Sequence, residues 1–488
     1  MNKYSRLGKN TGLIIVGNIG SRFISFFMLP FYTTWLSVKD YGIIDLIQVY
    51  TSFILSIISC CIYESIFVFP KGQKKEKQTT YFSSGIYYTI LLFAITGILS
   101  FIFHFILVNN HVKNFYTTYS LYLYIIIFLS FTQTYTQQFS RSLNQMNIYA
   151  LCGIIYTASM AISSIILLPI YGVYGFLIAQ IVSLAISTIY TFLFGKMYKF
   201  INWSYIQKRE YIEMLKYALP LIPNALIWWL ILSFNRPVIE SYIGLKAVGL
   251  FAVACKLPNM IGAFYNMFGT SWQISVLEEF NNSDYTYFFN RVCRFIVLGL
   301  VFISSLMCIT SKWIISLLTS VEFIDAWIYI PILSLAILFS NISNFIGATF
   351  SAVKQSKYYF YSGIWGAISS IVFNFTLIPT YGLYGAAISM VLANFIILIS
   401  RTIYSWKYVK IQNLFSYVIM IGINIIIAIS VCIIDNLLIK SISIVIFLSI
   451  LILANKSVIR DLYNNLILHF NQNKKQIQNE SIQKNFKE

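Results

Sequence analysis

Residues 167–180, "LLPIYGVYGFLIAQ", are followed 210 positions further on by residues 377–390, "LIPTYGLYGAAISM". Pro, Tyr, Gly, Tyr and Gly occupy the same places in both stretches. The match extends upstream, where the pairs are Gln145 with Gln355, Tyr149 with Tyr359, and Gly153 with Gly363. So long a match at one fixed offset predicts an internal duplication.

A second pair of stretches lies nearer the start of each copy. Residues 36–45, "LSVKDYGIID", correspond to residues 243–252, "IGLKAVGLFA", at an offset of 207. We predict a six-helix lobe over residues 1–210, a second over 211–410, two further helices over 411–459, and a polar cytoplasmic tail over 460–488. Six crossings return the chain to its starting side, so the lobes are parallel repeats with the substrate path between them.

The composition is that of a membrane protein. Of the 488 residues, 58% are hydrophobic and only 10% are charged, against about 25% charged in soluble domains. Apolar runs of about 20 residues, the length of a membrane-crossing helix, follow one another along the chain. They predict fourteen spans, at residues 11–36, 42–69, 81–108, 118–140, 147–168, 173–195, 212–235, 246–273, 292–318, 326–351, 357–377, 383–404, 412–434 and 440–456.

The net charge of +18 reports topology and does not indicate nucleic-acid binding. Basic clusters such as "KGQKKEK" (71–77) fall on one side of the fourteen-span topology, and few basic residues fall on the other. By the positive-inside rule that side is cytoplasmic, together with both termini, in the cell's cytoplasmic membrane. Attraction to anionic membrane lipids is a secondary consequence.

The duplicated motif has a structural role in this topology. Pro169 and Pro379 each end a helix, and Gly172 and Gly382 permit a tight turn into the next one. The motif therefore predicts the outer connection between the fifth and sixth helix of each lobe, outside the substrate site.

Polar residues inside the spans mark the candidate site, because a charge at the bilayer centre costs roughly 2.5 kcal/mol or more. Arg22 lies about 14 Å into the first span at 1.5 Å per residue. Asn18 and Ser25 share its helical face. The alternative for Arg22 is a structural contact that locks neighbouring helices.

Two corresponding helices carry polar stripes. The eighth helix has Lys256, Asn259, Asn266, Thr270 and Gln273, and the second has Asp45, Ser52, Ser56, Ser59 and Tyr63. These stripes predict a wet central cavity, with polar helix packing as the alternative.

Three other charged residues are interpreted differently. Arg236 and Glu240 are four residues apart, which favours an ion pair that reaches the outer surface, with substrate binding by Arg236 as the weaker alternative. Glu64 and Asp45 are among the few carboxylates that could bind a coupling proton.

Other chemistry finds little support in the sequence. The seven cysteines and three histidines lack metal-ligand spacing, so we expect no metal and no cofactor. No phosphate-cradling ATPase loop, paired acids or nucleophile–base arrangement occurs, so an enzyme is disfavoured.

The segments "NIGSRFISFFMLPFY" (18–32) and "NRPVIESYIGLKAVGLFAVACKLPNM" (235–260) resemble the Wzx-type oligosaccharide flippases, the polysaccharide-export branch of the multidrug/oligosaccharidyl-lipid/polysaccharide (MOP) exporter superfamily. The resemblance covers nearly the whole chain. It implies a V-shaped pair of lobes that open alternately to the two sides of the membrane. It also implies a cationic cavity, a role that maps onto Arg22 and Lys256 and, less strongly, onto Arg236.

The implied cargo is an oligosaccharide repeat unit on undecaprenyl pyrophosphate, destined for O antigen, capsule or another surface polysaccharide. The polysaccharide polymerase and chain-length machinery are implied partners. A multidrug cation exporter and a lipid II flippase of the same superfamily are the alternatives. The cation exporter is expected to have an acid in the first helix, where this chain has Arg22. A repeat-unit polymerase or ligase would need a larger outer loop than any present here.

Overall fold

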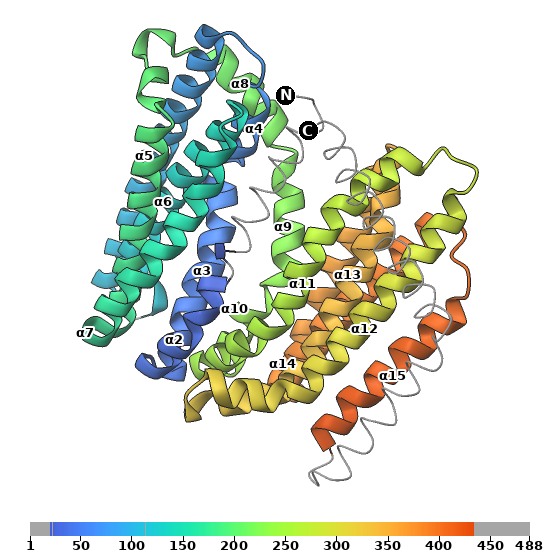
Figure 1. The fold of residues 1–488 in the computed structure, drawn as a ribbon. Coiled ribbons are helices and arrows are strands. Elements are labelled where there is room, and N and C mark those ends of the chain that lie inside the picture. Colours follow the sequence, from blue (N-terminus) through green and yellow to red (C-terminus); the bar gives the residue numbers. More distant parts are fainter. Residues whose placement is uncertain (1–19, 22, 113, 434–488) are drawn as a thin grey trace, which may run out of the picture.

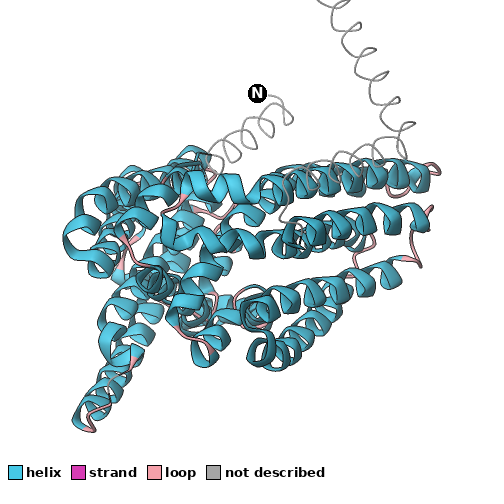
Figure 2. Ribbon diagram, turned by 90° about the horizontal axis from the view of Figure 1, so that it is seen from below, coloured by secondary structure: helices cyan, strands magenta, loops and turns pink. Residues whose placement is uncertain are grey.

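The computed structural model describes residues 20–21, 23–112 and 114–433. Every regular element among these residues is helical, and none of them lies in a β-strand (Figure 2). The structure therefore confirms the expected all-α class.

The first lobe is built from the helices at the left of Figure 1. After a helical stretch at residues 23–27 come α2 (Leu29–Trp35), α3 (Val38–Ile58), α4 (Ile62–Val68), α5 (Lys75–Asn109), α6 (Phe115–Ser142) and α7 (Met146–Phe194). Two short 3₁₀ turns, η1 (Met197–Phe200) and η2 (Trp203–Tyr205), lead out of this lobe.

The second lobe follows. Its elements are α8 (Lys208–Ala218), α9 (Leu221–Leu232), α10 (Asn235–Tyr242), α11 (Leu245–Glu279), α12 (Tyr285–Leu318), η3 (Val321–Tyr329), α13 (Ile330–Ala352) and α14 (Lys357–Ser405), and α15 (Leu414–Ile433) comes after it. Helix α8 lies at the top of the first lobe in Figure 1, whereas α9 descends between the lobes.

The duplicated motif forms the same kink in both lobes. Within α7, Gly172 has φ 54° and ψ −128°, and within α14, Gly382 has φ 59° and ψ −133°. Such angles are open to glycine and strained for other residues. A Cβ added to Gly175 would collide with the carbonyl oxygen of Leu167, and one on Gly385 with that of Leu377. The predicted tight turn between paired helices is confirmed.

The length and hydropathy of the helices confirm a multi-pass membrane protein. In the described part of the chain, nine helices are long and apolar enough to cross a membrane, or ten if the bent pair α8–α9 is one span. Because α7 and α14 each cross twice, these helices account for the predicted spans from 42–69 through 412–434. The first predicted span is described only in part, and the span at 440–456 lies outside the described residues.

The second predicted span, 42–69, is not one continuous helix. Helix α3 ends at Ile58, and Cys60 and Cys61 adopt left-handed φ angles of 48° and 52° before α4 begins. The two thiols donate to the carbonyl oxygens of Ile57 and Ser56 at 3.6 Å, which partly satisfies the end of α3.

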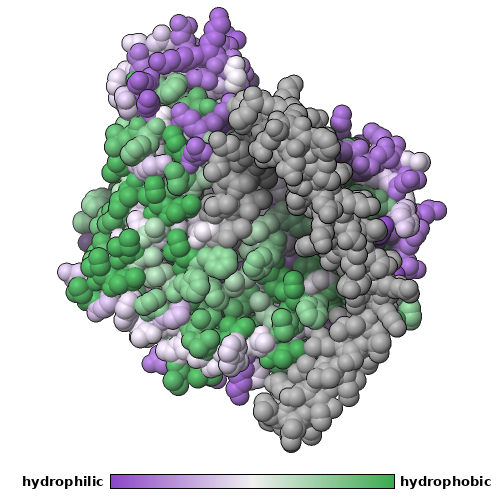
Figure 3. Space-filling view, viewed as in Figure 1, coloured by the Kyte–Doolittle hydropathy of each residue, from purple (hydrophilic) through white to green (hydrophobic). Residues whose placement is uncertain are grey.

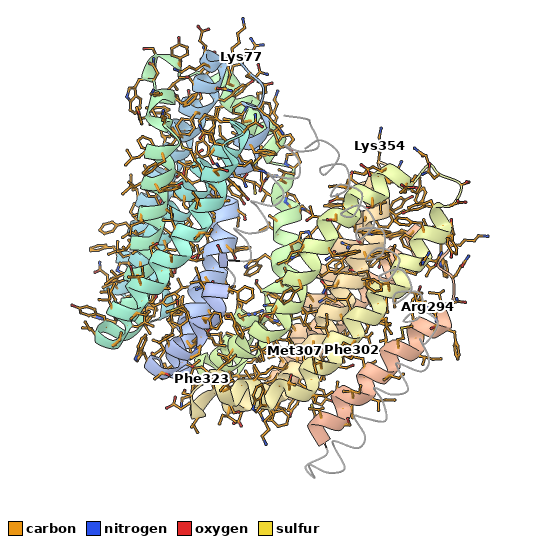
Figure 4. All side chains as sticks on the ribbon, viewed as in Figure 1. Lys77, Arg294, Phe302, Met307, Phe323 and Lys354 are labelled. Carbon is orange, nitrogen blue, oxygen red and sulfur yellow. The ribbon has the colours of Figure 1, made fainter. Side chains whose placement is uncertain are left out.

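The two lobes meet at one end and diverge toward the other (Figure 1). In Figure 4, Lys77 and Lys354 lie at the diverging tips, and Phe323 lies at the end where the lobes meet. A hydrophobic band covers the middle of the visible surface in Figure 3, and hydrophilic residues gather at the diverging end. This distribution fits a bilayer around the middle of the helices.

Candidate functional site

The lobes are in contact at the meeting end through two glycines at equivalent positions of the repeat. Gly42 on α3 faces the start of α11, and a Cβ added to it would collide with the carbonyl oxygen of Leu245. Gly249 on α11 faces the start of α3, and a Cβ there would collide with the carbonyl oxygen of Val38. We call this backbone-to-backbone contact the glycine seam.

An ion pair crosses between the lobes next to the glycine seam. Arg236 Nε on α10 lies 3.4 Å from Asp45 Oδ2 on α3, and this is the one ion pair among the described residues. Arg236 Nη1 also donates to the Leu232 carbonyl at 2.7 Å and to Asn235 Oδ1 at 2.8 Å. The guanidinium carbon lies 5.3 Å from the centre of the Phe251 ring. The side chains are only 10% and 15% exposed, so the pair is shielded from solvent.

Neutral contacts also join the lobes, both at this end and further along α3. Trp229 Nε1 on α9 donates to the Val49 carbonyl on α3 at 3.0 Å. The Tyr41 and Phe323 rings pack edge to face with centroids 5.7 Å apart. These contacts join the lobes without adding charge.

Lys256 on α11 is the second cation at the interface. Its side chain is exposed and lines the same small cavity as Tyr41 and Asp45. No carboxylate in the described part of the chain forms an ion pair with it. Among the described residues, two cations and one acid thus lie together at this level of the interface, which leaves an excess positive charge there.

Two cavities meet at Lys256. The smaller, of about 40 Å³, is lined by Tyr32, Leu36, Tyr41, Ile44, Asp45, Gln48, Phe176 and Lys256. The larger, of about 170 Å³, is lined by Phe23, Ser25, Phe26, Leu29, Lys256, Asn259, Met260, Ala263, Phe264 and Met267. The larger cavity combines a mostly apolar wall with one cation, an amide and a hydroxyl, a lining suited to an amphipathic anion.

The structure places the predicted stripe of the eighth helix on one exposed face. Lys256, Asn259, Asn266, Thr270 and Gln273 are all exposed, whereas Leu257, Ile261, Tyr265 and Trp272 between them are buried. Only Lys256 and Asn259 reach the larger cavity. Gln273 Nε2 donates to Ser351 Oγ at 3.3 Å, further toward the diverging end.

The stripe of the second helix is only partly brought to the site. Asp45 lines the smaller cavity, but Ser59 is buried and donates to the Leu55 carbonyl at 2.6 Å. Glu64 is an exposed residue of α4, beyond the break at Cys60 and Cys61, so it is separated from Asp45 by most of α3.

One predicted contact is wrong. Arg236 does not pair with Glu240 at the surface; it is buried and bonds to Asp45 of the other lobe. The sequence separation of four residues favoured a local pair, but α10 directs Arg236 toward α3. Asn18 and Arg22 lie outside the described residues, so their roles stay predictions.

Several site residues were missed in the sequence. Tyr32, Tyr41 and Gln48 line the smaller cavity with Asp45. Gln48 lies three residues after Asp45, a helical spacing that could have revealed it. Gly42 and Gly249 align at the offset of 207, so a repeated glycine was also a usable signal. In the described residues, no group of three or more His, Cys, Asp or Glu is placed to bind a metal ion.

Comparison with known proteins adds a family to this geometry. Residues 7–273 match the family described as "Polysaccharide biosynthesis protein". A 195-residue stretch, 39% of this chain, is 25% identical to the capsular polysaccharide biosynthesis protein CapF of Staphylococcus aureus. The match spans about half of that relative, 49% of its length.

Solved structures show the same fold. The lipid II flippase MurJ in an inward closed conformation superposes with a TM-score of 0.70 at 17% identity, over 93% of this chain and 99% of MurJ. An inward-facing multidrug resistance MATE family transporter of the MOP superfamily gives a TM-score of 0.63 at 14% identity, over 80% of this chain and 97% of that one.

A MOP superfamily transporter from Pyrococcus furiosus, described as having a binding pocket of reverse polarity, gives a TM-score of 0.56 at 13% identity, over 82% of this chain and 95% of that one. The family match covers more than half of the chain, and the fold is shared with MurJ and the MATE transporters. The chain is therefore a multi-pass membrane protein that belongs to the polysaccharide biosynthesis protein family.

Proposed function

We propose that the protein flips undecaprenyl-pyrophosphate-linked oligosaccharide repeat units across the cytoplasmic membrane for surface polysaccharide biosynthesis, by alternating access between its two lobes. The family match and the likeness to the CapF protein support a role in polysaccharide assembly. The transporter fold supports movement of a cargo rather than its chemical conversion.

The observation on which the cargo class rests is Lys256. It is an exposed cation at the junction of two cavities between the lobes, without an ion-pair partner among the described residues. At short range and poor screening, attraction between an ammonium and a pyrophosphate is worth several kcal/mol. The neighbouring Phe23, Phe26 and Phe264 supply an apolar wall of the kind that a polyprenyl chain requires.

The orientation follows from charge. Exposed lysines of the "KGQKKEK" segment, among them Lys77, lie at the diverging end together with Lys354. The positive-inside rule makes that end cytoplasmic. The glycine seam then lies at the outer side, and the lobes diverge toward the cytoplasm.

A multidrug cation exporter fits the site less well, because the one acid at the cavity, Asp45, already pairs with Arg236. A lipid II flippase has the same fold and an equally anionic cargo. Experiment distinguishes lipid II from a lipid-linked oligosaccharide repeat unit as the cargo.

The test is deletion of the gene and analysis of the undecaprenyl-linked pool. We expect one oligosaccharide repeat unit to accumulate on the cytoplasmic leaflet, with loss of surface polysaccharide. Accumulation of lipid II would favour its flippase, and an unchanged pool with altered drug sensitivity would favour the exporter. Complementation with Arg22→Ala or Lys256→Ala at normal protein level should restore less than about a tenth of the polysaccharide, in line with loss of a short-range charge contact. Full restoration by both variants would remove the cationic site from the proposal.

A further inference from the structure

We propose that Asp45 is a positioning residue that transmits the binding of an anion at Lys256 to the closure at the outer end of the lobes. This inference rests on the proposed function, since it takes a lipid-linked diphosphate as the cargo. Asp45 holds the outer side shut through Arg236 when the site is empty and releases it when the anion arrives.

Asp45 lies beside both cations. Its carboxylate pairs with Arg236 Nε on α10 at 3.4 Å and lines the same small cavity as Lys256 on α11. Both cations belong to the second lobe, and the acid belongs to the first. One carboxylate therefore provides the electrostatic attraction between the lobes at this level.

The glycine seam, Asp45 and Lys256 lie at successive depths along α3 and α11. At 1.5 Å per residue, Gly42 and Gly249 are each about 6 Å from the outer starts of α3 and α11. On the same basis Asp45 is about 10 Å from the start of α3, and Lys256 is about 16 Å from the start of α11. An anion that approaches from the diverging end thus reaches Lys256 first, Asp45 next and the glycine seam last.

The bonds of Arg236 show which contact can break. Its two shorter hydrogen bonds, to Leu232 and Asn235, lie within its own lobe at 2.7 and 2.8 Å. The contact with Asp45 is longer, at 3.4 Å, and crosses the interface. Loss of Asp45 would leave the guanidinium held in place by its own lobe and by the Phe251 ring.

The cavity volumes indicate on which side of Lys256 the anion binds. The smaller cavity, beside Asp45, has about 40 Å³, which is space for a few waters at about 10–15 Å³ each. The larger cavity has about 170 Å³ and also ends at Lys256. A diphosphate in the larger cavity would draw Lys256 away from Asp45 and place negative charge near the carboxylate.

Both effects weaken the electrostatic attraction between the lobes. Asp45 loses one of its two cations and faces a like charge, which disfavours its present position. Other contacts between the lobes at the outer end are neutral, among them the glycine seam, the Tyr41–Phe323 contact and the hydrogen bond from Ser320 N–H to Thr33 Oγ1 at 3.4 Å. The outer side can then open once cargo is bound, and an empty transporter stays shut.

The experiment measures the outer opening directly. Lys39 and Lys246 are exposed residues at equivalent positions, at the outer starts of α3 and α11. Spin labels attached through p-acetylphenylalanine at these positions leave the seven cysteines untouched. Their distance distribution is recorded in nanodiscs, with and without undecaprenyl diphosphate as the probe.

For the unsubstituted protein we expect the probe to increase the long-distance population. Asp45→Asn should raise that population without any probe, by about fivefold in the open-to-closed ratio for loss of a partly shielded ion pair, and the probe should add little more. Glu240→Gln, which removes a nearby acid that forms no ion pair with Arg236, is the matched control and should behave as the unsubstituted protein.

The outcomes separate the inference from the proposed function. If Asp45→Asn stays closed without the probe, or still responds to it as fully as the unsubstituted protein, the inference is overturned. If the probe shifts neither protein and does not bind, the diphosphate cargo fails, whereas opening of probe-free Asp45→Asn would still support Asp45 as the closing contact. Loss of probe binding in Asp45→Asn alone would identify a structural role and contradict the inference.

Discussion

The two lobes are alike where they form the frame and different where they form the site. The kinks at Gly172 and Gly382 have nearly the same angles, and Gly42 and Gly249 contribute equally to the seam. By contrast, Asp45 corresponds to Ala252 at the 207-residue offset, and Lys256 corresponds to Val49. Positions retained in both copies build the architecture, whereas the charges of Asp45 and Lys256, present in one copy, lie at the candidate site.

A second difference concerns the helices that line the interface. Helix α11 runs unbroken from Leu245 to Glu279, whereas its counterpart in the first lobe is divided into α3 and α4 at Cys60 and Cys61. The division separates α3, which packs on α11 of the second lobe, from α4, which packs on α6 and on α8, the latter through the Ser65–Met214 hydrogen bond of 2.8 Å. The break lets the two halves follow different neighbours.

The largest effect is expected at the shared kinks. Gly175→Ala and Gly385→Ala each introduce a methyl group against a backbone carbonyl that cannot move aside. We expect each change to cost about 3 kcal/mol of stability, the upper end for overpacking, and to lower the unfolding temperature in detergent similarly in both lobes. Gly299→Ala, whose Cβ would meet nothing within 4 Å, is the control. A large loss of stability in only one of the two variants would contradict the structural equivalence of the kinks.

A smaller effect is expected at the glycine seam, because the lobes can relieve the clash by separating. Gly249→Ala should shift the equilibrium toward the outward-open state by roughly 1–3 kcal/mol. The spin-label distance between positions 39 and 246 measures the shift. Gly262→Ala in the same helix, whose Cβ would lie 3.8 Å from its nearest neighbour, should leave the distance unchanged. An unchanged distance in Gly249→Ala would show that the seam is not the outer closure.

The smallest effect is expected at the break in the first lobe. A left-handed conformation costs a non-glycine residue about 1–2 kcal/mol, so Cys60→Gly should raise the unfolding temperature slightly, and the β-branched Cys60→Val should lower it. At the equivalent position in unbroken α11, Met267→Gly should be destabilising, since glycine weakens a helix by about 0.5–1 kcal/mol. If both glycine variants destabilise the protein, the asymmetry between the two helices is smaller than described.

The frame could be predicted from the sequence because it depends on local and repeated signals. Hydropathy located the spans, and the Pro–Gly pattern located both kinks. The break at Cys60 could not be predicted, since neither cysteine is a usual helix breaker and the neighbouring pattern continues as a helix. The cross-lobe pair of Arg236 was missed because its partner, Asp45, is 191 residues away in sequence, and a local partner at four residues was available.

The central claim is that the cation present in only one copy of the repeat, Lys256, binds an anionic lipid-linked cargo during transport. Its most direct test is a reconstituted flipping assay. Proteoliposomes with the unsubstituted protein or Lys256→Met receive a fluorescent undecaprenyl-diphosphate-linked oligosaccharide, and its transfer between leaflets is followed by accessibility to an added glycosidase. We expect the unsubstituted protein to transfer the lipid at least about tenfold faster than Lys256→Met, which corresponds to about 1.4 kcal/mol. Equal rates for the two proteins, or no transfer above empty liposomes, would contradict the account.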